Sequence, residues 1–214
     1  MNLYDKKNES CALYLITPPI IELSEFKEEL VQALTPGLVE VVQLRLKGVD
    51  DQHVIDVGKT LRPICHHFDT TFIVNDRPDL AIKIGADGVH LGEEDSNVKN
   101  ARTILGSSAI IGVSCYNSKH KAMLASEEGA NYVAFGAFYH TKTKIPKYRA
   151  RIDIIEDWSY ISNVACVAIG GITANNCSNI VNAGADYIAV ISAIWNDKEG
   201  PMKAVMKFTK FLNH

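Results

Sequence analysis

The sequence predicts an α/β protein in which eight parallel strands alternate with eight helices and close into one barrel. Short apolar runs alternate regularly with stretches of helical spacing, which is typical of a parallel sheet. A Gly-Ala-Asp or Gly-Ala-Asn turn recurs between helix and strand at residues 85–87, 129–131 and 184–186. Eight such units in 214 residues favour a single (β/α)8, or TIM, barrel over an open doubly wound sheet. We expect one domain over residues 1–214, with residues 1–10 as a flexible N-terminal extension.

Each strand is expected where a short apolar or β-branched run follows a turn. At the three repeated turns, Gly ends the helix in a left-handed C-cap, and Asp or Asn turns the chain before the next strand. The strands are expected at residues 12–17, 39–47, 71–74, 88–91, 109–114, 132–136, 164–169 and 187–191.

Each helix is expected where apolar residues recur every three or four positions. Asp50 or Asp51 is the expected N-cap of the second helix, Pro78 fits the first turn of the third, and Asp95 or Ser96 is the expected cap of the fourth. The helices are expected at residues 23–34, about 50–66, 78–83, from that cap to 105, 118–128, 152–158, 174–182 and about 201–212.

Composition excludes several classes of protein. Hydrophobic residues at 47%, charged residues at 22% and a net charge of −3 describe an ordinary soluble globule without the basic excess that nucleic acid or membrane binding needs. The five cysteines are odd in number and contain no C-x-x-C pair, which indicates reduced thiols and not a disulfide framework or a zinc site. The polar N-terminus is unlike a signal peptide, so we expect a cytoplasmic protein. A homo-oligomer stays open.

The second strand carries an unusual polar face. Residues 41–47 alternate apolar and polar, so Gln43, Arg45 and Lys47 point to one side. In a surface hairpin that face would simply be wet, whereas both faces of a parallel sheet are normally apolar. Two cations and an amide on one face of a buried strand therefore predict a bound anion, above all a phosphate or diphosphate.

Chemistry in such a barrel is expected where the strands run into the following loops. Asp76 and Asp95 come from adjacent strand ends. Two carboxylates beside a cationic strand suit Mg²⁺ shared with a diphosphate, because Mg²⁺ takes few protein oxygens and completes its octahedron with phosphate and water. The alternative is that Asp95 is only a helix cap and that Asp76 is only a turn residue.

The last two strand ends predict a second anion site. Gly170 and Gly171 follow the seventh strand, where backbone N–H groups can approach an oxyanion closely, and Ile191 and Ser192 open a short helix after the eighth. These loops are the usual phosphate site of the barrel. A Gly-Gly pair alone is equally typical of a tight turn.

Taken together, the strand-end motifs resemble those of the thiamine-phosphate synthase family over nearly the whole chain. The family condenses hydroxymethylpyrimidine diphosphate with a thiazole phosphate, and it requires Mg²⁺. The motifs that carry the resemblance are residues 43–47, 74–77, 89–95, 111–114, 135–136, 141–144, 169–172 and 190–193.

The resemblance implies a role for each site residue. Asp76 and Asp95 would bind Mg²⁺, and Ser114 would lie near the diphosphate or the pyrimidine. Arg45, Lys47 and Lys144 would stabilise the departing diphosphate. The pyrimidine diphosphate would be held by Gln43, Arg45, Lys47, Asn75 and Lys144. The thiazole phosphate would be received by Thr141, Thr143, Gly170, Gly171, Ile191 and Ser192.

The chain departs from the family pattern at a few positions. Leu46 stands where the family usually has Glu, and Glu93 stands where it commonly has Gln. Tyr116 replaces the usual His, and Ala137 replaces the usual Pro. The related thiazole tautomerase uses that His for proton transfer, so Tyr116 argues against tautomerase activity. A barrel that binds phosphate ligands without catalysis, or a phosphate-sugar isomerase, stays open as an alternative. The seven histidines show no metal-ligand spacing, and we assign His90 a structural role.

Overall fold

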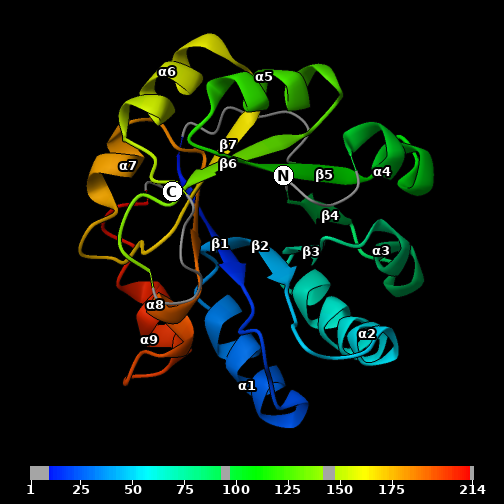
Figure 1. Cartoon of the computed structure of the whole chain (residues 1–214). Helices are drawn as coiled ribbons and strands as arrows, with labels where there is room; N and C mark the ends of the chain where they lie inside the picture. The colour runs from blue at the N-terminus through cyan, green and yellow to red at the C-terminus, as the bar shows by residue number, and fades with distance from the viewer. Residues whose placement is uncertain (1–9, 93–96, 142–147, 213–214) are drawn as a thin grey trace.

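The fold is a closed barrel of eight parallel strands surrounded by helices (Figure 1). The computed structural model describes residues 10–92, 97–141 and 148–212. Each strand pairs in parallel with its neighbours in sequence, and β1 also pairs with β8. The predicted TIM barrel is therefore confirmed. The predicted flexible extension, residues 1–10, lies outside the described residues except for Ser10.

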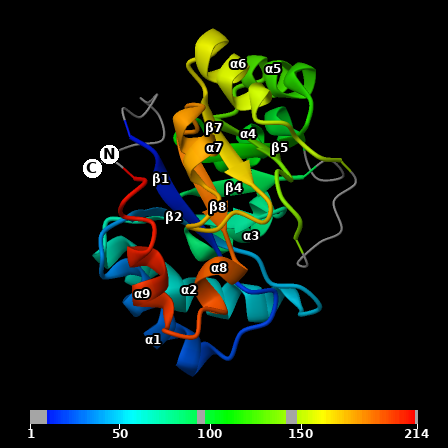
Figure 2. The same cartoon turned by 90° about the vertical axis from the view of Figure 1, so that its left-hand side faces the viewer.

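The strands are short, and most of their residues are buried. They are β1 Ala12–Ile16, β2 Val39–Leu44, β3 Thr71–Asn75, β4 Gly88–Leu91, β5 Ile110–Tyr116, β6 Tyr132–Gly136, β7 Ala165–Ile169 and β8 Tyr187–Val190. The helices form the outer layer, and the last of them packs against the first beside the β8–β1 closure (Figure 2). They are α1 Leu23–Leu34, α2 Asp51–His67, α3 Pro78–Ile84, α4 Val98–Leu105, α5 Lys119–Glu127, α6 Asp153–Ile161, α7 Ser178–Asn182, α8 Ser192–Trp195 and α9 Pro201–Met206.

Local sequence signals account for several element ends. The Asp50 carboxylate accepts the backbone N–H of His53 at 2.8 Å, so Asp50 caps α2. Pro78 occupies the first turn of α3, where its missing N–H costs nothing. Gly85 ends α3 with φ +74°, and the Gly of each of the other two repeated turns also has a positive φ.

Other predicted boundaries are wrong. The cap of α4 is neither Asp95 nor Ser96, which lie outside the described residues, but Asn97, whose side chain accepts the N–H of Asn100 at 2.8 Å. Strand β2 ends at residue 44 and not 47, because the N–H of Arg45 turns to the Thr17 hydroxyl.

The last helices also differ from the prediction. Helix α7 begins at residue 178 and not 174, because Asn176 instead closes a turn by accepting the N–H of Thr173 at 2.8 Å. Helix α9 ends at residue 206 and not 212, where tighter turns such as Phe208 N–H to Val205 O replace it. With the short α8 counted, the described residues form nine helices and not eight.

The core has two layers. A large apolar layer lies between the strands and the helices, and a smaller one fills the barrel interior. Within the interior, Tyr132 occupies space that Gly112 leaves open, since a Cβ on Gly112 would come within 1.9 Å of the Tyr132 ring. All five cysteines lie buried in the described part of the chain and form no disulfide. No helix in the described ranges has the length and apolar character needed to cross a membrane.

Candidate active site

A cavity of about 600 Å³ opens at the carboxyl ends of the strands, and we call it the barrel cavity. Every predicted site residue in the described ranges lines it. These residues are Gln43, Arg45, Lys47, Asn75, Asp76, Ser114, Thr141, Gly170, Gly171, Ile191 and Ser192. The other three predicted residues, Asp95, Thr143 and Lys144, lie outside the described residues. Strand ends far apart in sequence thus converge on one space.

The β2 side of the cavity carries the amide and the two cations. Gln43 is buried at the end of the strand, with 2% of its surface exposed. Beyond the strand, the N–H of Arg45 donates to the Thr17 hydroxyl at 2.9 Å, and the N–H of Lys47 donates to the Pro19 carbonyl at 2.9 Å. These contacts with the segment after β1 fix the backbone, so both cationic side chains still line the cavity after β2 has ended.

Asp76 follows β3 in a left-handed backbone conformation, with φ +65°. Its N–H donates to the His90 carbonyl at 2.7 Å, which ties the turn to β4, and its carboxylate lies 3.2 Å from Lys47 Nζ. The described residues include no cluster of three or more His, Cys, Asp or Glu side chains that could hold a metal ion. A single carboxylate beside two cations at the rim of this cavity nevertheless fits Mg²⁺, which takes one or two protein carboxylates and completes its shell with phosphate and water.

Arg77 is the next residue, yet it is engaged elsewhere. Its guanidinium donates two hydrogen bonds to Asp79 and two to Asp51, all between 2.7 and 2.8 Å. The hydrogen bonds that Arg77 donates to Asp79 and Asp51 raise the pKa of Arg77 above its ordinary value. Two carboxylates already balance this cation, and Arg77 does not line the barrel cavity.

The Gly-Gly turn after β7 is shaped by the chain that packs on it. Gly170 and Gly171 have φ +104° and +68°, in the region that side chains disfavour. A Cβ on Gly170 would lie 2.3 Å from the Ala137 Cβ, and one on Gly171 would lie 2.4 Å from the His140 carbonyl. The N–H of Tyr139 also donates to the Gly170 carbonyl at 2.9 Å. Only glycines let the β6 and β7 loops approach this closely.

His90 is the site residue whose contacts sequence reasoning missed. Its Nε2 lies 2.8 Å from the Ser114 hydroxyl, and its Nδ1 lies 3.0 Å from the Tyr132 hydroxyl. Burial lowers the pKa of His90 to about 4, with Asp76 opposing and Arg45 adding to the effect. The signal was the alternation of β4, because Val89 and Leu91 belong to the outer apolar layer, which directs His90 inward.

Two tyrosines form a further part of the wall. Tyr116, which stands where the resembled family has a His, has φ +56°. Its ring meets that of Tyr148 edge to face, with centroids 5.9 Å apart, and both line the barrel cavity. These two contacting rings therefore form an aromatic part of the cavity wall.

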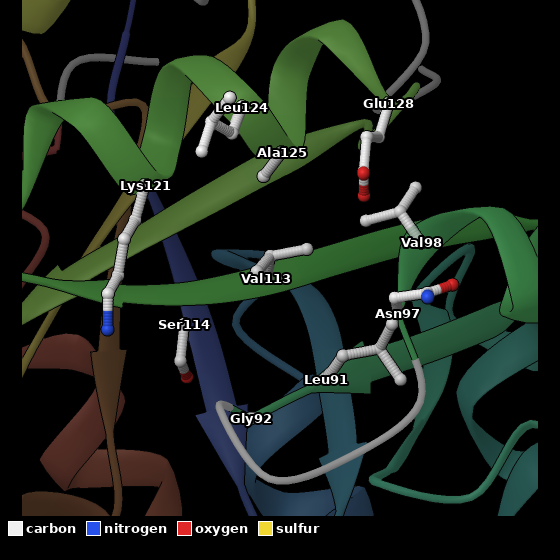
Figure 3. A pocket seen from close by; sticks show the side chains of 10 residues that line it. All are labelled: Leu91, Gly92, Asn97, Val98, Val113, Ser114, Lys121, Leu124, Ala125 and Glu128. Atoms are coloured by element: carbon white, nitrogen blue, oxygen red, sulfur yellow. The ribbon is translucent and has the colours of Figure 1, made fainter.

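A second cavity of about 400 Å³ lies outside the barrel between α4 and α5 (Figure 3). Leu124 and Ala125 project into it from α5 and Val98 from α4, while the Ser114 side chain points away from α5 (Figure 3). Of the predicted site residues in the described ranges, only Ser114 lines it. The barrel cavity is therefore the candidate active site.

Comparisons with known proteins agree with this geometry. Residues 13–194 match the family model described as thiamine monophosphate synthase. A thiamine-phosphate synthase of Rhodospirillum centenum is 48% identical over 94% of this chain and 98% of its own length. That of Hyphomonas neptunium is 46% identical over 92% of this chain and 91% of its own.

Solved structures give the same result. The thiamine phosphate pyrophosphorylase of Pyrococcus furiosus superposes with a TM-score of 0.84 at 32% identity, covering 98% of this chain and 97% of that one. A 3-hexulose-6-phosphate synthase superposes with a TM-score of 0.67 at 16% identity, covering 94% of this chain and 100% of that one, which shows the fold alone. The match to the family model over residues 13–194 includes every residue that lines the barrel cavity. The chain belongs to the thiamine monophosphate synthase family.

Proposed function

We propose that this chain is a transferase that makes thiamine phosphate from hydroxymethylpyrimidine diphosphate and a thiazole phosphate, releasing diphosphate. The observation that carries the proposal is the composition of the barrel cavity. Cations and amides gather at the β2 and β3 ends, and a glycine turn and a hydroxyl gather at the β7 and β8 ends. One cavity thus offers separate places for two phosphorylated substrates, and relatives with this activity match nearly the whole chain.

The β2 and β3 ends hold the pyrimidine diphosphate in this proposal. Gln43 and Asn75 supply amide hydrogen bonds, while Arg45 and Lys47 supply charge-assisted contacts to the diphosphate oxygens. Lys144, outside the described residues, adds a third cation. Because the leaving diphosphate gains charge as its bond to carbon breaks, these contacts strengthen in the transition state and favour reaction.

Asp76 and Asp95 would hold Mg²⁺ against the diphosphate. When bound, Mg²⁺ neutralises part of the charge on the leaving group. The contact of Asp76 with Lys47 supports this assignment, since it places a carboxylate directly beside a cation that lines the same cavity. Lys47, which already contacts Asp76, would also lie beside the bound diphosphate.

The β7 and β8 ends would receive the thiazole phosphate. Gly170 and Gly171 present backbone in a conformation that lets an anion approach closely, and Ile191 and Ser192 lie beside them in the cavity wall. Thr141 and Thr143 would add hydroxyl donors from the β6 loop. Phosphate at this end of the cavity would direct the thiazole ring toward the pyrimidine.

The reaction that follows is a dissociative substitution. The bond between the pyrimidine methylene carbon and the diphosphate oxygen breaks, and the electron pair leaves with diphosphate. The aminopyrimidine stabilises the resulting cation, and the lone pair of the thiazole nitrogen then forms the new carbon–nitrogen bond. No proton has to be removed, so the protein needs no strong general base. Its residues hold the nucleophile in line and stabilise the departing charge.

The test is product formation from the two purified substrates. With Mg²⁺ and both substrates, thiamine phosphate and diphosphate should form in equal amounts. Omitting either substrate or chelating the metal should stop the reaction. A barrel that only binds phosphate ligands would show heat of binding by calorimetry and no product, and that result would refute the proposal.

A further inference from the structure

A chain of hydrogen-bonded side chains runs from the barrel interior to the wall of the barrel cavity, and we call it the polar chain. It joins Tyr14 of β1, Tyr132 of β6, His90 of β4 and Ser114 of β5. The Tyr14 and Tyr132 hydroxyls lie 2.8 Å apart, and the Tyr132 hydroxyl lies 3.0 Å from His90 Nδ1. His90 Nε2 lies 2.8 Å from the Ser114 hydroxyl, which faces the cavity.

Packing holds this polar chain rigidly in place. Tyr132 has no exposed surface, and its ring rests against the backbone of Gly112. The His90 ring stacks on the Tyr132 ring with an interplanar angle of 24°, and Tyr14 meets Tyr132 edge to face. Because four different strands supply the members, none can rotate away without disturbing the barrel core.

Counting protons gives the polar chain a direction. Within the described part of the chain, the Tyr14 hydroxyl has one hydrogen-bond partner, the hydroxyl of Tyr132. If Tyr132 donated to Tyr14, the Tyr14 proton would be buried without an acceptor, at a cost of about 1–3 kcal/mol. Tyr14 therefore donates to Tyr132, and Tyr132 donates to His90 Nδ1.

The direction of the remaining hydrogen bond, between His90 and Ser114, follows from the His90 tautomer. With Nδ1 accepting, a neutral imidazole carries its proton on Nε2 and donates it to the Ser114 oxygen. The Ser114 oxygen thus accepts a hydrogen bond from His90, and the Ser114 hydroxyl proton points into the barrel cavity.

We propose that His90 is a positioning residue that fixes Ser114 as a hydrogen-bond donor toward the bound pyrimidine diphosphate. This inference rests on the proposed function and adds a direction to the site. The ligand atom that Ser114 meets must be an acceptor, either a ring nitrogen or a diphosphate oxygen, and a ligand N–H or NH₂ would find no acceptor there.

The His90 tautomer can be measured without any turnover. In protein labelled with ¹⁵N-histidine, the His90 resonances, assigned with His90→Asn, should show a protonated Nε2 and an unprotonated Nδ1 at neutral pH. Ser114→Ala should shift mainly the Nε2 signal, and Tyr132→Phe mainly the Nδ1 signal. The opposite tautomer, or a charged ring, would overturn the proposal whatever the enzyme's activity.

Two substitutions of His90 separate positioning from packing. A Gln amide reaches about as far as Nε2 and can still donate to Ser114, whereas an Asn amide reaches only the Nδ1 position, near Tyr132. We expect kcat to fall about tenfold in His90→Asn and clearly less in His90→Gln, with KM for the thiazole phosphate unchanged in both. His120→Asn, on the exposed face of α5, is the matched control. An equal loss in Asn and Gln variants would indicate a packing role and overturn the proposal.

A double-mutant cycle shows whether His90 acts through Ser114. In a Ser114→Ala background, His90→Asn should lower kcat by no further factor, because the hydroxyl that it orients is gone. If the double variant instead loses kcat by the product of the two separate factors, His90 acts independently of Ser114, and the proposal would fail. If the His90 variants do not fold, as judged by circular dichroism, the histidine whose Nε2 signal shifts between wild type and Ser114→Ala identifies His90, and its tautomer still decides.

Binding experiments distinguish the two acceptor classes. Calorimetry measures the affinity of two ligands, hydroxymethylpyrimidine alone and inorganic diphosphate with Mg²⁺. Each ligand is titrated into the wild type and into Ser114→Ala. Ser114→Ala should weaken one of these ligands about tenfold, and that ligand carries the acceptor. Unchanged affinity for both would overturn the donor role. A wild type that makes no thiamine phosphate would instead refute the proposed function, while the tautomer measurement would still report on the polar chain.

Discussion

Lys47 Nζ and Asp76 Oδ2 lie 3.2 Å apart at the mouth of the barrel cavity. The two residues come from the ends of adjacent strands, β2 and β3, and both side chains line the cavity. The Lys47 side chain is half exposed and that of Asp76 is 27% exposed, so this ion pair contributes little to the stability of the fold. In the proposed function, the same cation and carboxylate would contact the Mg²⁺ and the diphosphate.

Replacing Asp76 by Asn should therefore impair catalysis and spare the fold. The amide keeps the shape of the side chain but loses the charge that would attract Mg²⁺. We expect kcat at saturating Mg²⁺ to fall about a hundredfold and the Mg²⁺ concentration for half-maximal rate to rise. Asp157→Asn, which removes a surface ion pair with Lys119, is the matched control and should keep full activity. Unchanged Mg²⁺ dependence in Asp76→Asn would contradict a metal role for this residue.

Two arginines near the β2 and β3 ends should respond differently to the same change. Arg45 lines the barrel cavity, whereas Arg77 is balanced by Asp51 and Asp79. Arg45→Gln should lower kcat/KM for the pyrimidine diphosphate about a hundredfold, since a charge-assisted contact to the leaving group is lost. Arg77→Gln should change kcat/KM by less than about threefold. Steady-state kinetics with each purified variant provides the measurement, and equal losses would show that Arg77 is part of the site after all.

Glycine at position 170 should be required for two separable reasons. Gly170→Ala would place a methyl group 2.3 Å from the Ala137 Cβ and force a side chain into φ +104°. Gly129→Ala meets a similar φ of +95° with no atom within 4 Å, so it isolates the backbone strain, about 1–2 kcal/mol.

Thermal melting and substrate kinetics test this pair of variants. Both should lower Tm, and Gly170→Ala should lower it more because of the added clash. Only Gly170→Ala should also raise KM for the thiazole phosphate. A Gly170 variant with the same KM as the wild type would remove the glycine turn from the proposed thiazole phosphate site.

Much of the fold could be predicted from the sequence because its signals are local. Apolar periodicity gave the bounds of α1, β4 and β6 as the structure has them. The boundaries that failed depend on hydrogen bonds that apolar periodicity does not encode. Asn176, for example, looks like a helical residue, but its side chain spans from the Thr173 N–H to the Gly171 carbonyl and delays the start of α7.

The candidate site, too, could be predicted only in part from the sequence. A parallel barrel brings its strand ends together, so the residues that line the cavity could be listed before their positions were known. Their hydrogen-bond partners could not. Arg77 follows the third strand much as Arg45 follows the second, and only its contact with Asp51 at the N-terminal end of α2 shows that its charge is already balanced. The contact of His90 with Tyr132 joins β4 to β6 across the barrel interior, and no spacing along the chain encodes it.

Lys144, outside the described residues, should act on the leaving group and not on the second substrate. By the proposed role, Lys144→Ala removes one cation from the departing diphosphate and should lower kcat about a hundredfold. KM for the thiazole phosphate should change much less, because that substrate gains no charge at its phosphate. Lys99→Ala, on the exposed surface of α4, is the control. An unchanged kcat would leave the stabilisation of the leaving group to Arg45, Lys47 and the metal.

His90 should make the stability of the protein depend on pH in a defined window. Burial lowers its pKa from 6.5 to about 4 in the folded state, whereas the unfolded chain restores the ordinary value. Between these two values the unfolded state binds a proton that the folded state does not, so the free energy of unfolding falls as the pH falls from about 6.5 to about 4.

For each unit that the pH falls within this window, the free energy of unfolding decreases by about 1.4 kcal/mol, and the total decrease is about 3 kcal/mol. The contribution is fully present above pH 6.5 and is lost below it. Because other groups titrate in the same range, the measurement is the difference in unfolding free energy between wild type and His90→Gln, by urea titration in Mg²⁺-free buffer from pH 7.5 to 4.5. Gln cannot titrate, so the advantage of the wild type over this variant should shrink steadily as the pH falls. A difference that stays constant over this range would mean that the imidazole is protonated as easily in the folded protein as in water, and His90 would then not be held neutral by its surroundings.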